Sequence, residues 1–149
     1  MKYLRLFEDF SDKHFIWIHG LPGSGKSHLA KIMNIDNQYE ILDDIASFDK
    51  IDSLLNAGSD IILTSPYFEE YLKFNGFYNK LINKLYEHKD YILEEIWFEN
   101  NPNACIENLK SRTKHSIKSE YIIPEIQIYS KDYKVPSNVD VMPIWKNNI

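Results

Sequence analysis

The most constraining feature of the chain is the segment GLPGSGKS at residues 20–27, which satisfies the pattern G-x-x-x-x-G-K-S/T in full. It holds three of the five glycines among 149 residues, and glycine lets a backbone approach a ligand closely. The segment follows a compact apolar run, HFIWIH at 14–19. It precedes Leu29, Ile32 and Met33, whose helical spacing predicts an inward-facing stripe. A buried strand must therefore end at a loop that begins a helix.

Apolar runs alternate with helical patterns along the rest of the chain. Strands are predicted at 39–42, 61–63, 91–98 and 139–142, and helices at 47–57, 65–88 and 101–112. Gly58 is expected to end the first of these helices, Ser65-Pro66 to begin the second and Asn75-Gly76 to kink or split it. Strands that alternate with helices predict an α/β three-layer sandwich around a mostly parallel five-stranded sheet.

Composition excludes several classes of protein. Hydrophobic residues make up 44% and charged residues 26% of the chain, which is ordinary globular usage, and a single domain over 1–149 is expected. The longest apolar run, at 15–18, is far shorter than a membrane span, and the N-terminus lacks a signal core. Cys105, the only cysteine, excludes a disulfide framework and fits the core of a cytoplasmic protein. The net charge of −5 disfavours electrostatic binding of duplex nucleic acid over a broad surface.

The residue types at 20–27 suit a triphosphate. Backbone N–H groups of such a loop surround an anion, and the helix that begins near Lys26 adds its positive end. Lys26 would bridge the β- and γ-phosphates, and the Ser27 hydroxyl would bind Mg²⁺. The dinucleotide pattern G-x-G-x-x-G is not met, because His28 stands at its third glycine. The alternative is a glycine-rich turn with an incidental lysine. The predicted ATP-binding residues are Gly20, Leu21, Pro22, Gly23, Ser24, Gly25, Lys26, Ser27 and His28.

With this loop the chain resembles the P-loop kinases, in particular the group around phage polynucleotide kinase and the zeta-toxin-like ATPases. The resemblance rests on FIWIHGLPGSGKS at 15–27, ILDDI at 41–45, FENNPNACIENLKSR at 98–112 and YKVP at 133–136. It implies a P-loop nucleoside triphosphatase or kinase fold and a lid over roughly 110–134. It also implies transfer of the γ-phosphate of ATP to a hydroxyl group.

An acidic pair closes the second predicted strand. The resemblance implies that Asp43, or else Asp44, accepts the proton of the substrate hydroxyl. Independently of the resemblance, a carboxylate at the carboxyl end of a strand faces the ligand crevice, where it can orient a hydroxyl or a Mg²⁺-bound water. Ser27, Asp43 and Asp44 are therefore the candidate metal ligands. The alternative for the pair is a solvated turn that caps the next helix.

Two positions depart from the family pattern. Ala46 stands where polynucleotide kinases of this group often place an arginine that grips a substrate phosphate, which weakens the case for a polynucleotide acceptor. Thr64-Ser65 follow the third strand where many P-loop ATPases have an acidic residue, which disfavours a motor-type ATPase.

A basic cluster lies in the predicted lid. It contains Lys110, Arg112, Lys114, His115 and Lys118. A guanidinium group suits bidentate phosphate contact, and Arg112 is the only arginine besides Arg5, so Arg112 is predicted to stabilise the transferring phosphoryl group. The alternative is a basic helix terminus favoured by the helix dipole.

These features together predict an ATP- and Mg²⁺-dependent phosphotransferase with Lys26, Asp43 and Arg112 as catalytic residues. The expected acceptor is the hydroxyl of a nucleoside, a nucleotide or a nucleic-acid end, in the cytoplasm, and in that of the host cell if the chain comes from a phage. The alternatives are a nucleotide-binding regulatory NTPase or switch without an acceptor, and a protein that binds nucleotide for stability alone.

Overall fold

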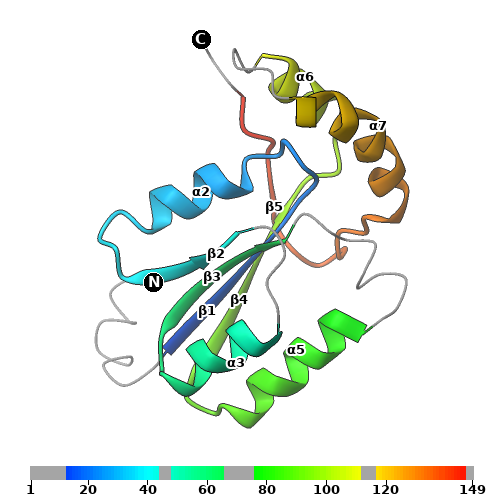
Figure 1. The fold of residues 1–149 in the computed structure, drawn as a ribbon. Coiled ribbons are helices and arrows are strands. Elements are labelled where there is room, and N and C mark those ends of the chain that lie inside the picture. The colour runs from blue at the N-terminus through cyan, green and yellow to red at the C-terminus, as the bar shows by residue number, and fades with distance from the viewer. Residues whose placement is uncertain (1–12, 44–47, 66–75, 112–116, 147–149) are drawn as a thin grey trace.

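The computed structural model describes residues 13–43, 48–65, 76–111 and 117–146 (Figure 1). Its centre is a five-stranded sheet in the order β2-β3-β1-β4-β5, and every pairing is parallel. The predicted α/β fold with a mostly parallel five-stranded sheet is therefore confirmed. The strands are β1 (Lys13–His19), β2 (Tyr39–Leu42), β3 (Asp60–Ser65), β4 (Tyr91–Phe98) and β5 (Val141–Met142).

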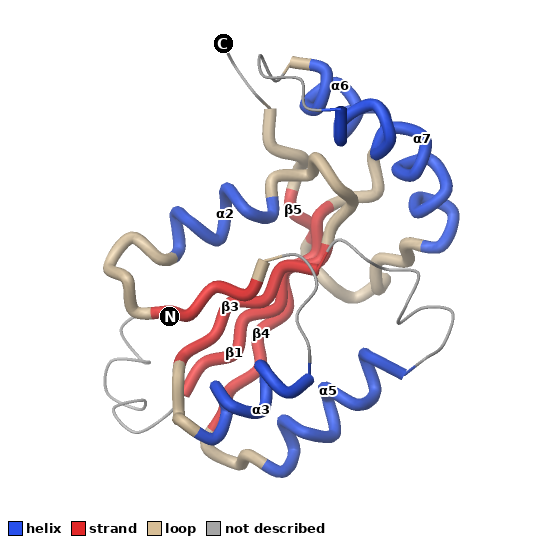
Figure 2. Tube along the Cα trace, viewed as in Figure 1, coloured by secondary structure: helices blue, strands red, loops and turns tan. Residues whose placement is uncertain are grey.

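Helices cover both faces of the sheet. They are α2 (Lys26–Met33), α3 (Phe48–Asn56), α5 (Gly76–Glu87), α6 (Pro102–Lys110) and α7 (Ile117–Asp132). In Figures 1 and 2, α2 lies on one face while α3 and α5 lie on the other, which gives three layers. The pair α6 and α7 packs together beyond the carboxyl ends of the strands, near β5. No helix in the described ranges is both long and apolar enough to cross a lipid bilayer.

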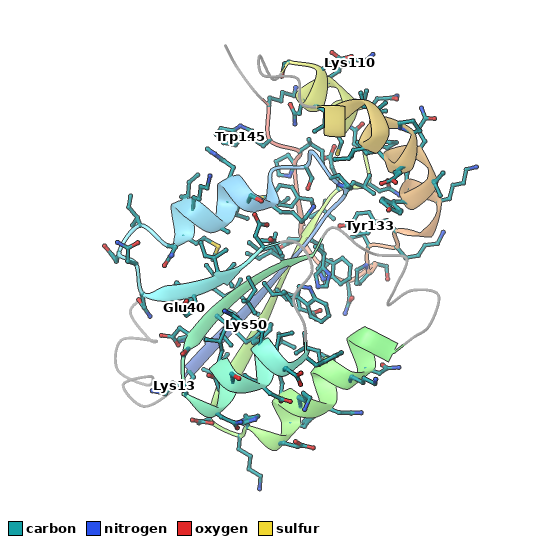
Figure 3. All side chains as sticks on the ribbon, in the orientation of Figure 1. Lys13, Glu40, Lys50, Lys110, Tyr133 and Trp145 are labelled. Carbon is teal, nitrogen blue, oxygen red and sulfur yellow. The ribbon has the colours of Figure 1, made fainter. Side chains whose placement is uncertain are left out.

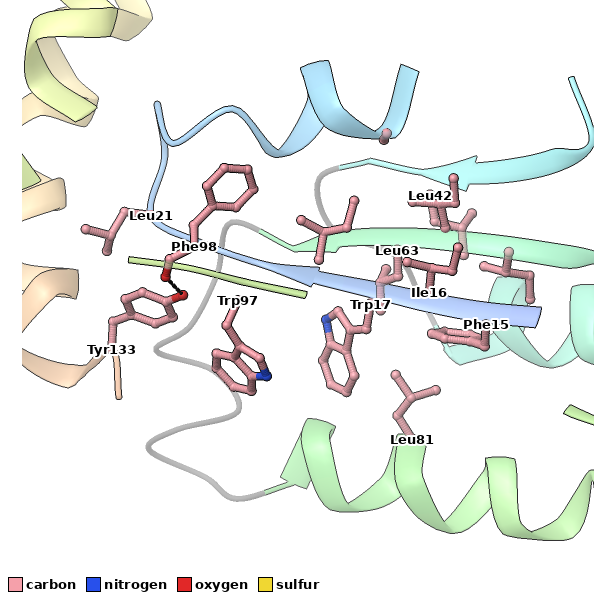
Figure 4. Close-up of a cluster of buried hydrophobic side chains, with 14 of the residues drawn as sticks. Phe15, Ile16, Trp17, Leu21, Leu42, Leu63, Leu81, Trp97, Phe98 and Tyr133 are labelled. Carbon is pink, nitrogen blue, oxygen red and sulfur yellow. Dashed lines mark hydrogen bonds between the residues drawn. The ribbon is translucent and has the colours of Figure 1, made fainter. Parts of the chain in front are cut away.

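The central strand β1 owes its position to its sequence. Strands covered on both faces read as continuous apolar runs, and Phe15 to Ile18 are all at most 2% exposed. Figure 4 shows Phe15, Trp17 and Trp97 pointing toward the side on which Leu81 of α5 lies, whereas Phe98 points toward α2. The carboxyl ends of β1 and its neighbours are thus fixed by packing on both sides.

Local capping signals define several element ends. Gly58 takes a positive φ of 73° two residues after the last residue of α3 and ends that helix as predicted. Asn101 is the N-cap of α6, because its side chain accepts a hydrogen bond from the backbone N–H of Ala104 at 3.1 Å, and Pro102 follows in the first turn. The predicted strand at 91–98 coincides with β4.

One expectation was wrong in detail, and another falls mostly outside the described residues. Ile32 does not face the core but is 51% exposed, because the inward stripe of α2 runs through Lys26, Ala30 and Met33. Ser65, the expected cap of the next helix, is the last residue of β3 and pairs with His19. The helix segment predicted between Pro66 and Asn75 lies outside the described residues, and α5 begins at Gly76.

Candidate functional site

The glycine-rich loop connects the central strand β1 to α2 at the carboxyl edge of the sheet. Gly23 and Gly25 adopt left-handed backbone conformations, with φ of 85° and 108°, and Gly25 is the N-cap of α2. A Cβ on Gly23 would lie 2.6 Å from the carbonyl oxygen of Cys105, and one on Gly25 would lie 2.5 Å from Cβ of Trp145. Both positions therefore require glycine for conformation and for space.

The side chain of Lys26 folds back onto the backbone of the loop. Its Nζ donates hydrogen bonds to the carbonyl oxygens of Gly20 at 2.8 Å and Leu21 at 2.9 Å, and the residue is buried. The N–H of Ser24 donates to the carbonyl of Leu21 at 3.1 Å, which adds a turn within the loop. A positive charge is thus held beside a loop that ends at a helix N-terminus, where backbone N–H groups favour anions.

A hydroxyl–carboxylate cluster lies next to the loop. Ser27 Oγ donates to Asp43 Oδ1 at 3.0 Å and Oδ2 at 3.1 Å, and the Thr64 hydroxyl donates to Asp43 Oδ1. The first turn of α2, the residue after β2 and the end of β3 meet at this point. Two of the three predicted metal ligands, Ser27 and Asp43, are therefore in contact. Oxygen atoms of this kind are those that Mg²⁺ prefers.

Asp43 is the only described member of its acidic pair. Asp44 lies outside the described residues, as do Ala46 and Arg112. Within the ranges that the structure describes, no group of three or more His, Cys, Asp or Glu side chains is placed to hold a metal ion. Lys110, from the predicted basic cluster, is exposed at the end of α6 (Figure 3).

His19 precedes the loop and is packed in the core. Its Nε2 lies 3.1 Å from Oε1 of Glu95, and its ring stacks on Trp97 with centroids 3.7 Å apart. Burial lowers the pKa of His19, the hydrogen bond and the charge of Glu95 oppose that shift, and the nearby charge of Lys26 adds to it. The side chain is therefore a structural element beneath the loop.

Two distant segments rest on the outer side of the loop. The Nδ2 group of Asn108, on α6, donates to the carbonyl of Gly23 at 2.9 Å and also to the carbonyl of Trp145. The N–H of Trp145 donates to the carbonyl of Ser24 at 3.0 Å, and the indole packs on the His28 ring at 3.9 Å between centroids. Figure 3 shows Trp145 beside the start of α2.

Cys105 is a core residue, as expected. It is fully buried on α6 against the loop, and burial raises the pKa of its thiol to about 11. A thiol with that pKa is almost entirely protonated at neutral pH and is a poor nucleophile.

Sequence reasoning found the loop and Asp43 but missed three residues beside them. Thr64 was noted only for standing where an acidic residue was expected, although its place at a strand end beside the loop is a usable signal. Asn108 and Trp145 carry no local pattern, because their partners are loop carbonyls far away in the sequence.

The fold and the site define a parallel α/β protein with a glycine-rich, lysine-closed loop at the end of its central strand. The chain belongs to the same family as "Uncharacterized protein R277" of Acanthamoeba polyphaga mimivirus, with 31% identity over 131 residues, which cover 83% of this chain and 88% of that protein. No family model matches the chain. No solved structure matches it.

Proposed function

We propose that the protein is a P-loop kinase, an ATP- and Mg²⁺-dependent phosphotransferase that moves the γ-phosphate to a hydroxyl acceptor. The observation that carries this proposal is the contact of Ser27 with Asp43 at the foot of a loop whose Gly23 and Gly25 are left-handed. The Ser27 side chain thus connects the proposed phosphate-binding loop to a carboxylate that can orient a hydroxyl. Phosphoryl transfer needs little more than such positioning and charge.

The loop supplies the phosphate contacts in this proposal. Backbone N–H groups of the loop, that of Gly25 among them, and the N-terminus of α2 would surround the phosphate oxygens. Lys26, which the carbonyls of Gly20 and Leu21 hold beside the loop, would transfer its donors to the β- and γ-phosphates. The strand order supports such a ligand. The connection from β1 leads toward β2 on one side of the sheet, and the connection from β3 leads to β4 on the other side. Ligand-binding crevices form at the carboxyl ends of strands where the connections change direction in this way.

The cluster beside the loop supplies the remaining chemistry. Asp43 would accept the proton of the acceptor hydroxyl, and its contact with Thr64 fixes the carboxylate at the end of β3. Ser27 and Asp43, together with Asp44, would hold Mg²⁺, which when bound neutralises charge on the phosphates. The proposed acceptor is a nucleoside, nucleotide or nucleic-acid hydroxyl. Arg112, two residues beyond the end of α6, would stabilise the transferring group.

The single cysteine, Cys105, suits a cytoplasmic enzyme. The thiol is free and buried, and a chain with one cysteine has no internal disulfide to form. Cytoplasmic proteins keep their thiols in that state.

Transfer of radiolabelled γ-phosphate from ATP to a panel of nucleosides, nucleotides and 5′-hydroxyl oligonucleotides tests the proposal. We expect one acceptor class to be labelled, and Lys26→Ala and Asp43→Asn each to lower the rate by at least about a hundredfold. Asp60→Asn is the control, because Asp60 lies at the other end of β3, away from the loop.

Each result of this assay has a clear meaning. Unchanged transfer in Lys26→Ala or Asp43→Asn would contradict the assigned roles. Hydrolysis of ATP with no acceptor labelled, and no effect of Asp43→Asn, would instead indicate a regulatory NTPase. Binding of ATP that raises the melting temperature without any turnover would indicate a protein that uses nucleotide only for stability.

A further inference from the structure

Two consecutive carbonyl groups of the loop are held from outside by residues more than eighty positions later. The side-chain amide of Asn108 donates to the carbonyl of Gly23 at 2.9 Å, and the backbone N–H of Trp145 donates to the carbonyl of Ser24 at 3.0 Å. The same Asn108 amide also donates to the carbonyl of Trp145 and so joins the two attachments. A single side chain therefore ties α6 and the segment after β5 to the loop.

These attachments set the direction of the loop N–H groups. A peptide unit is planar and trans, so its N–H points opposite to its C=O. The carbonyl of Gly23 points toward Asn108, and the N–H of Ser24 in the same unit turns back to the carbonyl of Leu21 at 3.1 Å. The carbonyl of Ser24 points toward Trp145, and the N–H of Gly25 therefore points away from Trp145, at the start of α2.

Close packing makes the attachment tight. There is no room for a methyl group between Gly23 and the carbonyl of Cys105, or between Gly25 and Trp145, so α6 and the C-terminal segment lie directly on the loop backbone. A loop of small residues without such contacts has many accessible conformations, and a ligand must fix them when it binds. The contacts of Asn108 and Trp145 with the loop, here called the clamp, fix the loop conformation before a ligand binds.

We infer that Asn108 is a positioning residue that orients the Gly23 peptide unit directly and the Ser24 unit through Trp145, and thereby sets the affinity of the loop for phosphate groups. This inference rests on the proposed function of the loop. In the proposed role Asn108 does not contact the phosphate groups and acts through the loop backbone.

Binding of inorganic tripolyphosphate and of ATP to Asn108→Ala, measured by titration calorimetry, tests the inference. Tripolyphosphate isolates the phosphate contacts from those of a nucleoside. The control is Asn103→Ala, the same substitution at an exposed position of the same helix. We expect Asn108→Ala to bind both ligands about tenfold more weakly per folded molecule, because the hydrogen bond to the loop carbonyl of Gly23 and the one to the carbonyl of Trp145 are both lost, and Asn103→Ala to match the original protein.

The outcomes separate this inference from the proposed function. Absence of binding by the unaltered protein would reject the phosphate site itself, and the inference with it. Binding by the unaltered protein and equally tight binding by Asn108→Ala would overturn the inference and leave the proposed function standing. An equal loss in Asn103→Ala would also overturn it, since the effect would then be a general one on α6.

A measurement on the unaltered protein covers the case in which Asn108→Ala does not fold. Coupling between ligand binding and formation of the clamp is reciprocal. If the clamp favours binding of the ligand, the bound ligand must stabilise the clamp. We expect tripolyphosphate to slow hydrogen exchange of the Trp145 backbone N–H, followed by NMR, by a factor of several. Exchange that is unchanged or faster when tripolyphosphate is bound would refute the inference.

Discussion

Gly23 and Gly58 offer a matched pair of substitutions that isolates the effect of crowding on the loop. Both residues have a positive φ, 85° and 73°, so alanine is strained at either one. The strain of an L-residue in the left-handed region is about 1–2 kcal/mol. The surroundings differ, because a Cβ on Gly58 would meet only Cε of Lys13 at 3.5 Å, an ordinary contact, whereas on Gly23 it would lie 2.6 Å from the carbonyl oxygen of Cys105.

The magnitudes follow from these two environments. Gly58→Ala carries the backbone strain alone, so its free energy of unfolding should fall by about 1–2 kcal/mol. Gly23→Ala adds an overlap with a carbonyl fixed inside α6, and overpacking of that kind costs typically about 1–3 kcal/mol more. Gly23→Ala is therefore expected to lose about 2–5 kcal/mol in total.

Urea unfolding followed by far-ultraviolet circular dichroism measures both values under the same conditions. Equal losses in the two variants would refute the reasoning, because they would mean that α6 does not press on the loop at Gly23. A smaller loss in Gly23→Ala than in Gly58→Ala would refute it more strongly.

Two further predictions concern the core beside the loop. The pKa of His19 is lowered from its ordinary 6.5, so the unfolded chain takes up this proton first as the pH falls, and stability is lost below about pH 6.5. The urea midpoint should thus drop between pH 7.5 and 5.5 and drop less in His19→Gln. An equal drop in both proteins would contradict this origin. The thiol of Cys105, with a pKa of about 11, is about one part in a thousand ionised at pH 8, so a disulfide reagent should label the native protein far more slowly than the urea-unfolded chain. Rapid labelling of the native protein would show that Cys105 is accessible.

The sequence was most informative where a local pattern determines the structure. The strand β1 contains a continuous apolar run, and Asn101-Pro102 and Gly58 marked helix ends because capping depends on neighbouring residues. The stripe on α2 was assigned wrongly at Ile32, since a small residue, Ala30, is the one that faces the sheet. Hydrophobic spacing alone does not show whether Ala30 or Ile32 faces the sheet.

The contacts around the loop depend on long-range geometry. Thr64 meets Asp43 because β2 and β3 are neighbours, and no local signal states that neighbourhood. The Asn108 and Trp145 contacts need β4, α6 and β5 in place, and their chemistry, a side-chain amide and a backbone N–H on carbonyls, leaves no motif. Topology had to be known before Asn108 and Trp145 could be recognised.

The strand order has a consequence for how the chain folds. β1 is synthesised first, yet both of its partners come later, and its pairing with β4 joins residues as distant as Lys13 and Tyr91. Such long-range pairing slows folding, because a long stretch of chain must be ordered before the pairs form. Trp145, a donor to the loop, lies after β5 in the sequence. On the ribosome, the segment at 20–27 is therefore made early but reaches its final shape only after Trp145 has emerged.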